Sequence, residues 1–172
     1  GERIIDLCSA PGGKTTFIGE LMKNIGEIVS VDRYETRLNL VKSAALRLGI
    51  SNAHFIVADA TSIRIPPGDR VLVDAPCSGL GVLAKKPDAK WKREPEDIRD
   101  LVMIQRNILE NATTLVKPNG CLVYSTCTTE PEENVDVVKD FLGNHPEFSI
   151  EIAHDRVPKE VVTSDGYIET MS

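Results

Sequence analysis

The segment Val71–Leu83, with the sequence VLVDAPCSGLGVL, joins an apolar run, a carboxylate (Asp74), a thiol (Cys77) and two glycines. This order is typical of a reactive loop that follows a buried strand. Cys77 is therefore a first candidate for a nucleophile that bonds covalently to a substrate. The alternative is a small, buried and inert cysteine, which is the commonest fate of a free thiol.

Polar or reactive residues also follow the other apolar runs that we predict as strands. The predicted strands span residues 3–7, 27–31, 54–58, 70–73 and 120–124. The residues that come next are Cys8 and Ser9, Asp32, Asp59, Asp74 to Cys77, and Ser125 to Cys127. Helix capping explains part of this series, but it is a poor explanation for all five strand ends. Ligands of doubly wound sheets bind outside the carboxyl ends of the strands, so the series predicts one shared site.

The intervening segments predict the helices that such a sheet needs. Apolar residues recur at helical spacing in residues 14–23, 36–48 and 95–115, and Pro95 suits the first turn of the third helix. Thr129 and Glu132 form a capping box that predicts a fourth helix, and Phe148–Ile152 is a candidate sixth strand. Because strands and helices alternate and the strands are continuous apolar runs, we expect an α/β fold with a doubly wound sheet and helices on both faces.

Length and composition restrict the class of protein. A chain of 172 residues fits one domain, and it has no apolar run long enough to span a membrane, so a cytoplasmic protein is the default expectation. The four cysteines lack the spacing of a zinc site and the three histidines are scattered, so we expect no metal. A net charge of −6 argues against holding nucleic acid by bulk electrostatics alone.

A local basic patch is formed by Lys85, Lys86, Lys90, Lys92 and Arg93, with Trp91 among them. A solvated, charged loop is the alternative for that patch.

The turn Pro11-Gly12-Gly13 can bring backbone amides at a helix N-terminus close to an anionic group. A Walker loop is excluded because it would need glycine where Cys8 stands, and the Gly-x-Gly-x-x-Gly dinucleotide fingerprint is absent. The turn therefore favours a nucleoside ligand whose anionic group need not be a phosphate.

Asp32 stands where Rossmann-like proteins use an acid to bind ribose hydroxyls, with a helix cap as an equal alternative. Asp59 has a similar ambiguity, because it could simply turn the chain.

Three motifs together resemble a known family. They are DLCSAPGGKT at Asp6–Thr15, DAPCSG at Asp74–Gly79 and STC at Ser125–Cys127. In this order they resemble the catalytic domain of RNA cytosine-5 methyltransferases of the Sun/Nop2 family, and bacterial members that act on 16S ribosomal RNA look closest. The resemblance runs from residue 3 to about residue 142. It implies a Rossmann-like, mostly parallel sheet of the class I S-adenosylmethionine-dependent methyltransferases.

The resemblance also implies roles for the residues at the strand ends. S-adenosylmethionine would lie with its methionine part along Cys8, Ser9, Ala10, Pro11, Gly12, Gly13 and Lys14. Asp32 would bind the ribose, Asp59 the adenine, and Asp74 would sit between the cofactor and the target base. In the family the Thr-Cys cysteine, here Cys127, is the nucleophile, and the Pro-Cys cysteine, here Cys77, helps to release the product. The dipole of a helix beginning near Thr129 could help to lower the pKa of Cys127.

A target base in folded RNA must be unstacked to reach such a pocket. We therefore expect Lys90, Lys92 and Arg93 to grip phosphates, with Trp91 as a stacking surface. Trp91 could equally anchor its loop to the core.

The chain departs from the family at both ends, where the family has an N-terminal RNA-binding extension and a last strand reading roughly His-Gly-Thr-Asp-Gly-Phe-Phe. We therefore expect residues 1–172 to be a single catalytic domain from a longer chain, with a sheet that lacks its last antiparallel strand. One rival is a DNA cytosine-5 methyltransferase with Cys77 itself as nucleophile, which the second thiol at Cys127 does not suit. Others are a methyltransferase for tRNA and a non-catalytic module that binds cofactor or RNA. The oligomeric state does not follow from the sequence.

Overall fold

The computed structural model describes residues 1–82, 94–152 and 157–170. In chain order, its strands and α-helices are β1 (Arg3–Asp6), α1 (Gly13–Met22), β2 (Glu27–Asp32), α2 (Glu35–Leu48), β3 (Ala53–Val57), β4 (Gly68–Asp74), α3 (Pro95–Thr113), β5 (Val116–Ser125) and α4 (Val135–Asn144). Short 3-10 turns occur at Leu80–Val82, Pro131–Glu133 and Lys159–Val161.

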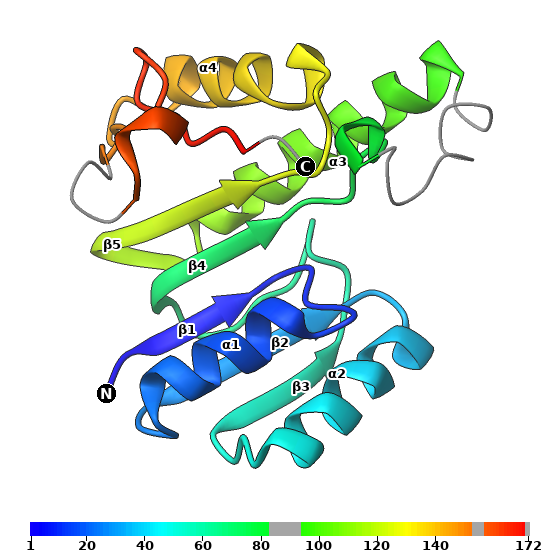
Figure 1. Cartoon of the computed structure of the whole chain (residues 1–172), viewed down its shortest axis with the longest axis vertical. Helices are drawn as coiled ribbons and strands as arrows, with labels where there is room; N and C mark the ends of the chain where they lie inside the picture. The colour runs from blue at the N-terminus through cyan, green and yellow to red at the C-terminus, as the bar shows by residue number, and fades with distance from the viewer. Residues whose placement is uncertain (83–93, 153–156, 171–172) are drawn as a thin grey trace.

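The strands form one sheet in the order β3-β2-β1-β4-β5, and every neighbouring pair is parallel. The chain starts in the middle of the sheet, runs outward to β3, and then returns to build β4 and β5 on the other side of β1 (Figure 1). The winding therefore reverses between β1 and β4, which is where doubly wound sheets bind ligands. The predicted doubly wound α/β sheet is confirmed.

Helices cover both faces of the sheet, as both sets of side chains along the strands require. On one face Ile5, Val29 and Val71 pack with Ile108 and Leu109 of α3. Val137 of α4 joins the same cluster, and α4 packs on α3. The other face is covered by α1 and α2 (Figure 1), where Leu38, Val41 and Ala10 form a second buried cluster.

The third helix forms as its sequence pattern predicts. Pro95 occupies its first turn, where the missing N–H costs no hydrogen bond, and Glu94 and Asp97 form a capping box in front of it. The predicted inward residues Ile108 and Leu109 are almost fully buried. This long helix supports the sheet beneath β4 and β5, the two strands that carry the predicted thiols.

Two predicted elements are wrong. Residues 148–152 form no strand: Ile150 and Ile152 are partly exposed and lie beside Gly166, so they pack against a C-terminal turn instead of a strand edge. Among the described residues, the only pairing near that end is an isolated antiparallel bridge between Val162 and Ile168.

The capping box at Thr129 and Glu132 does not form either. The segment Pro131–Glu133 is a 3-10 turn, and α4 begins only at Val135, after Asn134. Asn134, the N-cap of α4, has a non-helical backbone with φ −114° and ψ −100°, and its side chain is hydrogen-bonded to Thr126 and, at 2.7 Å, to the carbonyl of Thr128.

The first helix forms where it is predicted, but two of its four large apolar residues point outward, while Ile18 and Met22 are half-buried. Phe17 and Leu21 are exposed, whereas Thr15, Thr16 and Gly19 are buried. The close fit is made by Gly19, where an added Cβ would lie 2.6 Å from Ile50 Cγ2. Small residues therefore let α1 sit close to its neighbours.

Candidate active site

The two predicted thiols meet at the carboxyl ends of β4 and β5. Asp74 and Ser125 are partners in the parallel ladder, so the loops that follow them leave the sheet side by side. Cys77 Sγ lies 3.0 Å from Cys127 Sγ, and the backbone N–H of Cys127 donates to Cys77 Sγ at 3.2 Å. All four cysteines of the chain are free thiols. Two thiols that are far apart in sequence thus share one site.

The environments of the two thiols differ. Cys127 is exposed, whereas Cys77 is partly buried. Burial raises the pKa of Cys77 above its ordinary value, and its hydrogen bond with the Cys127 side chain raises it further. Cys77 is thereby favoured as a neutral thiol, which can donate a hydrogen bond to its neighbour. The helix that we expected to begin near Thr129, just after Cys127, begins at Val135 instead.

Asp74 connects the thiol loops to the turn after β1. Lys14 Nζ, at the start of α1, lies 2.6 Å from Asp74 Oδ2. Ser125 Oγ donates to Asp74 Oδ1 at 2.8 Å. Both carboxylate oxygens therefore have partners from neighbouring elements, and Asp74 is held at the point where the winding of the sheet reverses.

The turn between β1 and α1 contains a buried hydroxyl group without a hydrogen-bond partner in the part of the chain that the structure describes. Ser9 is buried, and among the described residues its Oγ has no hydrogen-bond partner. Asp6, the last residue of β1, is fully buried and accepts a hydrogen bond from Thr15 Oγ1 at 2.6 Å. Burial raises the pKa of Asp6 to about 6 and that of the Cys8 thiol to about 12. Cys8 is thus an inert thiol, while Ser9 is available to a ligand.

Asp32 holds this turn in place. The Asp32 carboxylate accepts hydrogen bonds from the backbone N–H of Ala10 at 3.3 Å and of Tyr34 at 3.0 Å. Arg37 Nη2 lies 4.0 Å from Asp32 Oδ2 and donates to the carbonyl of Ala10 at 3.1 Å. Tyr34 is the N-cap of α2 and no side chain caps that helix. The helix-cap alternative for Asp32 is therefore wrong.

Asp59 lies after β3, away from the thiols. It accepts hydrogen bonds from the N–H and Oγ1 of Thr61, at 2.9 and 2.7 Å, and Arg33 lies 3.6 Å away. The Thr61 N–H, followed by its hydroxyl, lowers the pKa of Asp59. Asp59 thus turns the chain, as the alternative reading expected, and its carboxylate is still partly exposed toward solvent.

Sequence reasoning missed the buried residues behind the thiols, Glu133 and Gln105. Both are fully buried, both are hydrogen-bonded to the loop that carries Cys77, and the Ser78 hydroxyl of that loop lies 2.9 Å from Thr128 Oγ1 in the loop that carries Cys127. The only signal was the segment Glu130-Pro131-Glu132-Glu133, which holds three acids and in which Glu132 was assigned to a capping box. The predicted RNA-binding residues, Lys90, Trp91, Lys92 and Arg93, lie outside the described residues.

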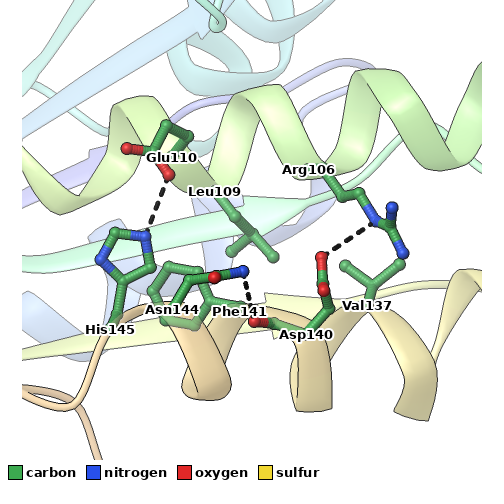
Figure 2. Close-up of a pocket in the computed structure, with 8 residues that line it drawn as sticks. All are labelled: Arg106, Leu109, Glu110, Val137, Asp140, Phe141, Asn144 and His145. Carbon is green, nitrogen blue, oxygen red and sulfur yellow. Dashed lines mark hydrogen bonds and ion pairs between the residues drawn. The ribbon is translucent and has the colours of Figure 1, made fainter.

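A pocket between α3 and α4 is a separate feature (Figure 2). It is lined by ion pairs, including Arg106 with Asp140 at 3.3 Å and His145 with Glu110 at 2.9 Å. None of its lining residues belongs to the strand ends. Its contacts join two helices, so it is not the candidate site. Within the described ranges we find no cluster of metal-binding side chains and no helix long and apolar enough to cross a bilayer.

A family model described as 16S rRNA methyltransferase RsmB/F matches residues 1–169. The chain belongs to this family. The probable ribosomal RNA small subunit methyltransferase B of Bacillus subtilis is 43% identical over 177 residues, an alignment that covers 99% of this chain and 40% of that protein. The chain therefore spans less than half the length of this relative.

Solved structures agree with the family assignment. The crystal structure of PH0851 matches with a TM-score of 0.91 and 36% identity, covering 99% of this chain and 39% of that one. NSun6 from Pyrococcus horikoshii, solved with SFG, matches with a TM-score of 0.77 and 36% identity, covering 83% and 37%. The fold is that of the class I S-adenosylmethionine-dependent methyltransferases, and the family predicted from three short motifs is confirmed.

Proposed function

We propose that this chain is the catalytic domain of an enzyme that methylates C5 of cytosine in RNA, with 16S ribosomal RNA as substrate and S-adenosylmethionine as methyl donor. The observation that carries the proposal is the pair of thiols, 3.0 Å apart at the ends of β4 and β5. A site with one reactive cysteine would need no second thiol in contact with it. A ribosomal substrate and the absence of a membrane-spanning helix among the described residues favour a cytoplasmic protein.

Cys127 is the nucleophile in this proposal. Cytosine C5 is a poor nucleophile, and addition of a thiolate to C6 makes C5 enamine-like, which divides one difficult step into easier ones. The exposure of Cys127 supports this role, since an unstacked base can approach an exposed sulfur more readily than the partly buried Cys77. The Cys127 Sγ–C6 bond then lasts until the methyl group has been added and solvent water has taken up the proton from C5.

Cys77 assists release. When the Sγ–C6 bond breaks, the electron pair returns to Cys127, and a neutral thiol beside it can stabilise the departing thiolate by a hydrogen bond. The raised pKa of Cys77 and the 3.0 Å separation of the sulfurs support this role. Asp74 is our candidate for the group that hydrogen-bonds near N3 of the base, and its contacts with Lys14 and Ser125 orient it.

The turn after β1 fits the cofactor. The unsatisfied hydroxyl of Ser9 and the backbone of residues 8–14 would contact the methionine part, and Lys14 would border it. Asp32 would bind the ribose and Asp59 the adenine. SFG, present in the structure of NSun6, is an analogue of S-adenosylmethionine. The bound cofactor supplies an electrophilic methyl group.

Lys90, Lys92 and Arg93 remain our candidates for binding RNA phosphates, and Trp91 remains our candidate for stacking on a base.

RNA that contains 5-fluorocytidine tests the assignment, because fluorine at C5 prevents the proton loss that release requires. With S-adenosylmethionine present, the wild-type chain should form a covalent adduct that survives denaturation. The adduct should disappear with Cys127→Ala. With ordinary cytidine, Cys77→Ala should accumulate an adduct that the wild type does not. An adduct that survives Cys127→Ala and disappears with Cys77→Ala would reverse the two roles.

The rival readings give different results in the same assay. A non-catalytic module would bind S-adenosylmethionine or RNA without forming an adduct in any variant. A DNA or tRNA enzyme would form the adduct with 5-fluorocytosine in those nucleic acids, and 16S ribosomal RNA fragments would not react. The contact between Cys77 and Cys127 favours the RNA enzyme over the DNA enzyme, because the latter would use Cys77 alone.

A further inference from the structure

The carboxyl group of Glu133 lies behind both thiols without reaching either. Glu133 ends the 3-10 turn before α4 and is fully buried. Among the described residues, no basic side chain forms an ion pair with it; its partners are Ser78 and Gln105. A buried carboxyl group is costly to desolvate, and an apolar residue of similar size would fill the same space without that cost. Its presence therefore calls for a role that hydrogen bonds perform.

The first loop bound by Glu133 is the one that carries Cys77, residues 75–79, here called the Cys77 loop. Glu133 Oε1 accepts from the backbone N–H of Ser78 at 2.9 Å, and Glu133 Oε2 accepts from Ser78 Oγ. On the other side of Cys77, the carbonyl of Pro76 accepts from Gln105 Nε2 at 3.0 Å. The same Nε2 donates to Glu133 Oε1 at 3.0 Å. The residues before and after Cys77 are thus tied to one buried pair of side chains.

The second loop carries Cys127, residues 126–130, here called the Cys127 loop. Thr128 Oγ1 lies 2.9 Å from Ser78 Oγ, so the hydroxyl that bonds to Glu133 also joins the residue after Cys127. The main chain of the Glu133 turn is fixed by Tyr124, whose hydroxyl donates to the carbonyl of Glu133 at 2.8 Å. Asn134, the next residue, donates to the carbonyl of Thr128 at 2.7 Å. One turn therefore anchors both loops.

We propose that Glu133 is a positioning residue, whose buried carboxyl group, together with Gln105, holds the Cys77 loop and the Cys127 loop at the spacing that lets the two thiols act on one base. This inference rests on the proposed function. Loops are the least rigid parts of a fold, and reacting groups must be held to within a fraction of an ångström. Gln105 Oε1 has no partner among the described residues, so this buried amide is retained for its two donated hydrogen bonds.

The test compares Glu133→Gln with Glu132→Gln, a matched control that makes the same change at the exposed neighbouring acid. Glu133→Gln keeps the volume but places an amide where Ser78 needs acceptors. Adduct formation with 5-fluorocytidine RNA should slow by about 100-fold, the scale expected for a misplacement of about 1 Å. The affinity for S-adenosylmethionine should stay within about twofold of wild type, because the hydrogen bonds of the Glu133 side chain go to Ser78 and Gln105 and not to the turn after β1.

A second readout does not depend on methyl transfer. Phenylarsine oxide binds two neighbouring thiols at once, so its affinity reports the spacing of Cys77 and Cys127, and Cys77→Ala gives the value for an unpaired thiol. Glu133→Gln should weaken capture by about tenfold relative to wild type, through the lost effective concentration of the second thiol. Glu132→Gln should match wild type in both assays. Wild-type capture and adduct rates in a folded Glu133→Gln variant would overturn the proposal.

If Glu133→Gln does not fold, Thr128→Val tests the proposal in its place. It removes the hydroxyl that links Ser78 to the Cys127 loop and that accepts from the backbone N–H of Glu130 at 3.2 Å, and it keeps the shape of the side chain. Weaker arsenical capture by Thr128→Val supports the positioning role, and unchanged capture overturns it. A wild-type chain that forms no adduct would refute the proposed function, while the arsenical comparison would still decide how Glu133 acts on the thiols.

Discussion

Replacing Gly12 by alanine should damage both the stability of the fold and the cofactor turn. Gly12 stands just before α1 with a φ of 112°, a backbone conformation that residues other than glycine rarely adopt. An added Cβ would also lie 3.0 Å from Val41 Cα and 3.1 Å from Val41 Cγ1. Val41 is fully buried in α2 and is therefore hard to displace.

Two costs add in this variant. The left-handed backbone should cost about 1–2 kcal/mol for a residue with a Cβ, and forcing a methyl group against a packed helix should cost about 1–3 kcal/mol. We therefore expect Gly12→Ala to lower the free energy of unfolding by about 2–5 kcal/mol. If the turn moves to relieve the contact, the affinity for S-adenosylmethionine should fall about tenfold, which corresponds to about 1.4 kcal/mol.

Gly49→Ala is the matched control. Gly49 ends α2 with a φ of 70°, and an added Cβ there would meet no atom within 4 Å. It should lose only the backbone contribution, about 1–2 kcal/mol, and bind the cofactor as wild type does. Urea unfolding measures the first quantity and titration calorimetry the second. Equal destabilisation in the two variants would refute the argument from Val41, and unchanged cofactor binding by Gly12→Ala would refute the placement of the cofactor at this turn.

Two further predictions concern pH. Burial raises the pKa of Asp6 from 3.8 to about 6 in the folded protein, so ionisation of Asp6 lowers the free energy of unfolding as pH rises through 6. Asp6→Asn should therefore be about 2–3 kcal/mol more stable than wild type at pH 8. This advantage should disappear below the pKa of Asp6 in the unfolded chain, and urea unfolding at several pH values measures it. Hydrogen bonds from His145 to Glu110 and Glu147 raise the pKa of His145, so their stabilisation is full below the unfolded pKa and is lost as pH rises through the folded one. His145→Gln should consequently cost about 0.5 kcal/mol more at pH 6 than at pH 9, in addition to the pH-independent loss of its ring contacts with Phe141 and Phe148, and an equal cost at both pH values would contradict the assignment.

The sheet and the meeting of the two thiols were predictable because they depend on regular geometry. Apolar runs followed by polar residues indicate parallel strands, and parallel strands place their carboxyl ends at one edge. Once β4 and β5 are neighbours, Asp74 and Ser125 stand opposite each other, and the loops that carry Cys77 and Cys127 must leave the sheet together. No long-range information beyond the strand order is needed for that step.

The residues that support the thiols were not predictable in the same way. Glu132 and Glu133 have the same side chain, and a capping box assigned the wrong one a role, because the pattern considers only local backbone groups. The buried position of Glu133 follows from partners that are distant in sequence, Ser78 in the loop after β4 and Gln105 on α3. The outward Phe17 and Leu21 of α1 are similar, since a close approach at Gly19 decides which face turns inward.

The strand ends, which were predictable, and the buried residues behind the thiols, which were not, contribute differently to the site. The strand ends bring the two cysteine loops to the same edge of the sheet, but strand register alone leaves the sulfur positions free to vary within flexible loops. A spacing of 3.0 Å requires a further constraint, and the buried hydrogen bonds of Glu133 and Gln105 supply one from behind the loops. Variants of the cysteines and variants of Glu133 or Gln105 should therefore have different effects. Loss of a thiol abolishes one chemical step. Loss of the buried hydrogen bonds slows the steps that need both thiols and leaves cofactor binding intact.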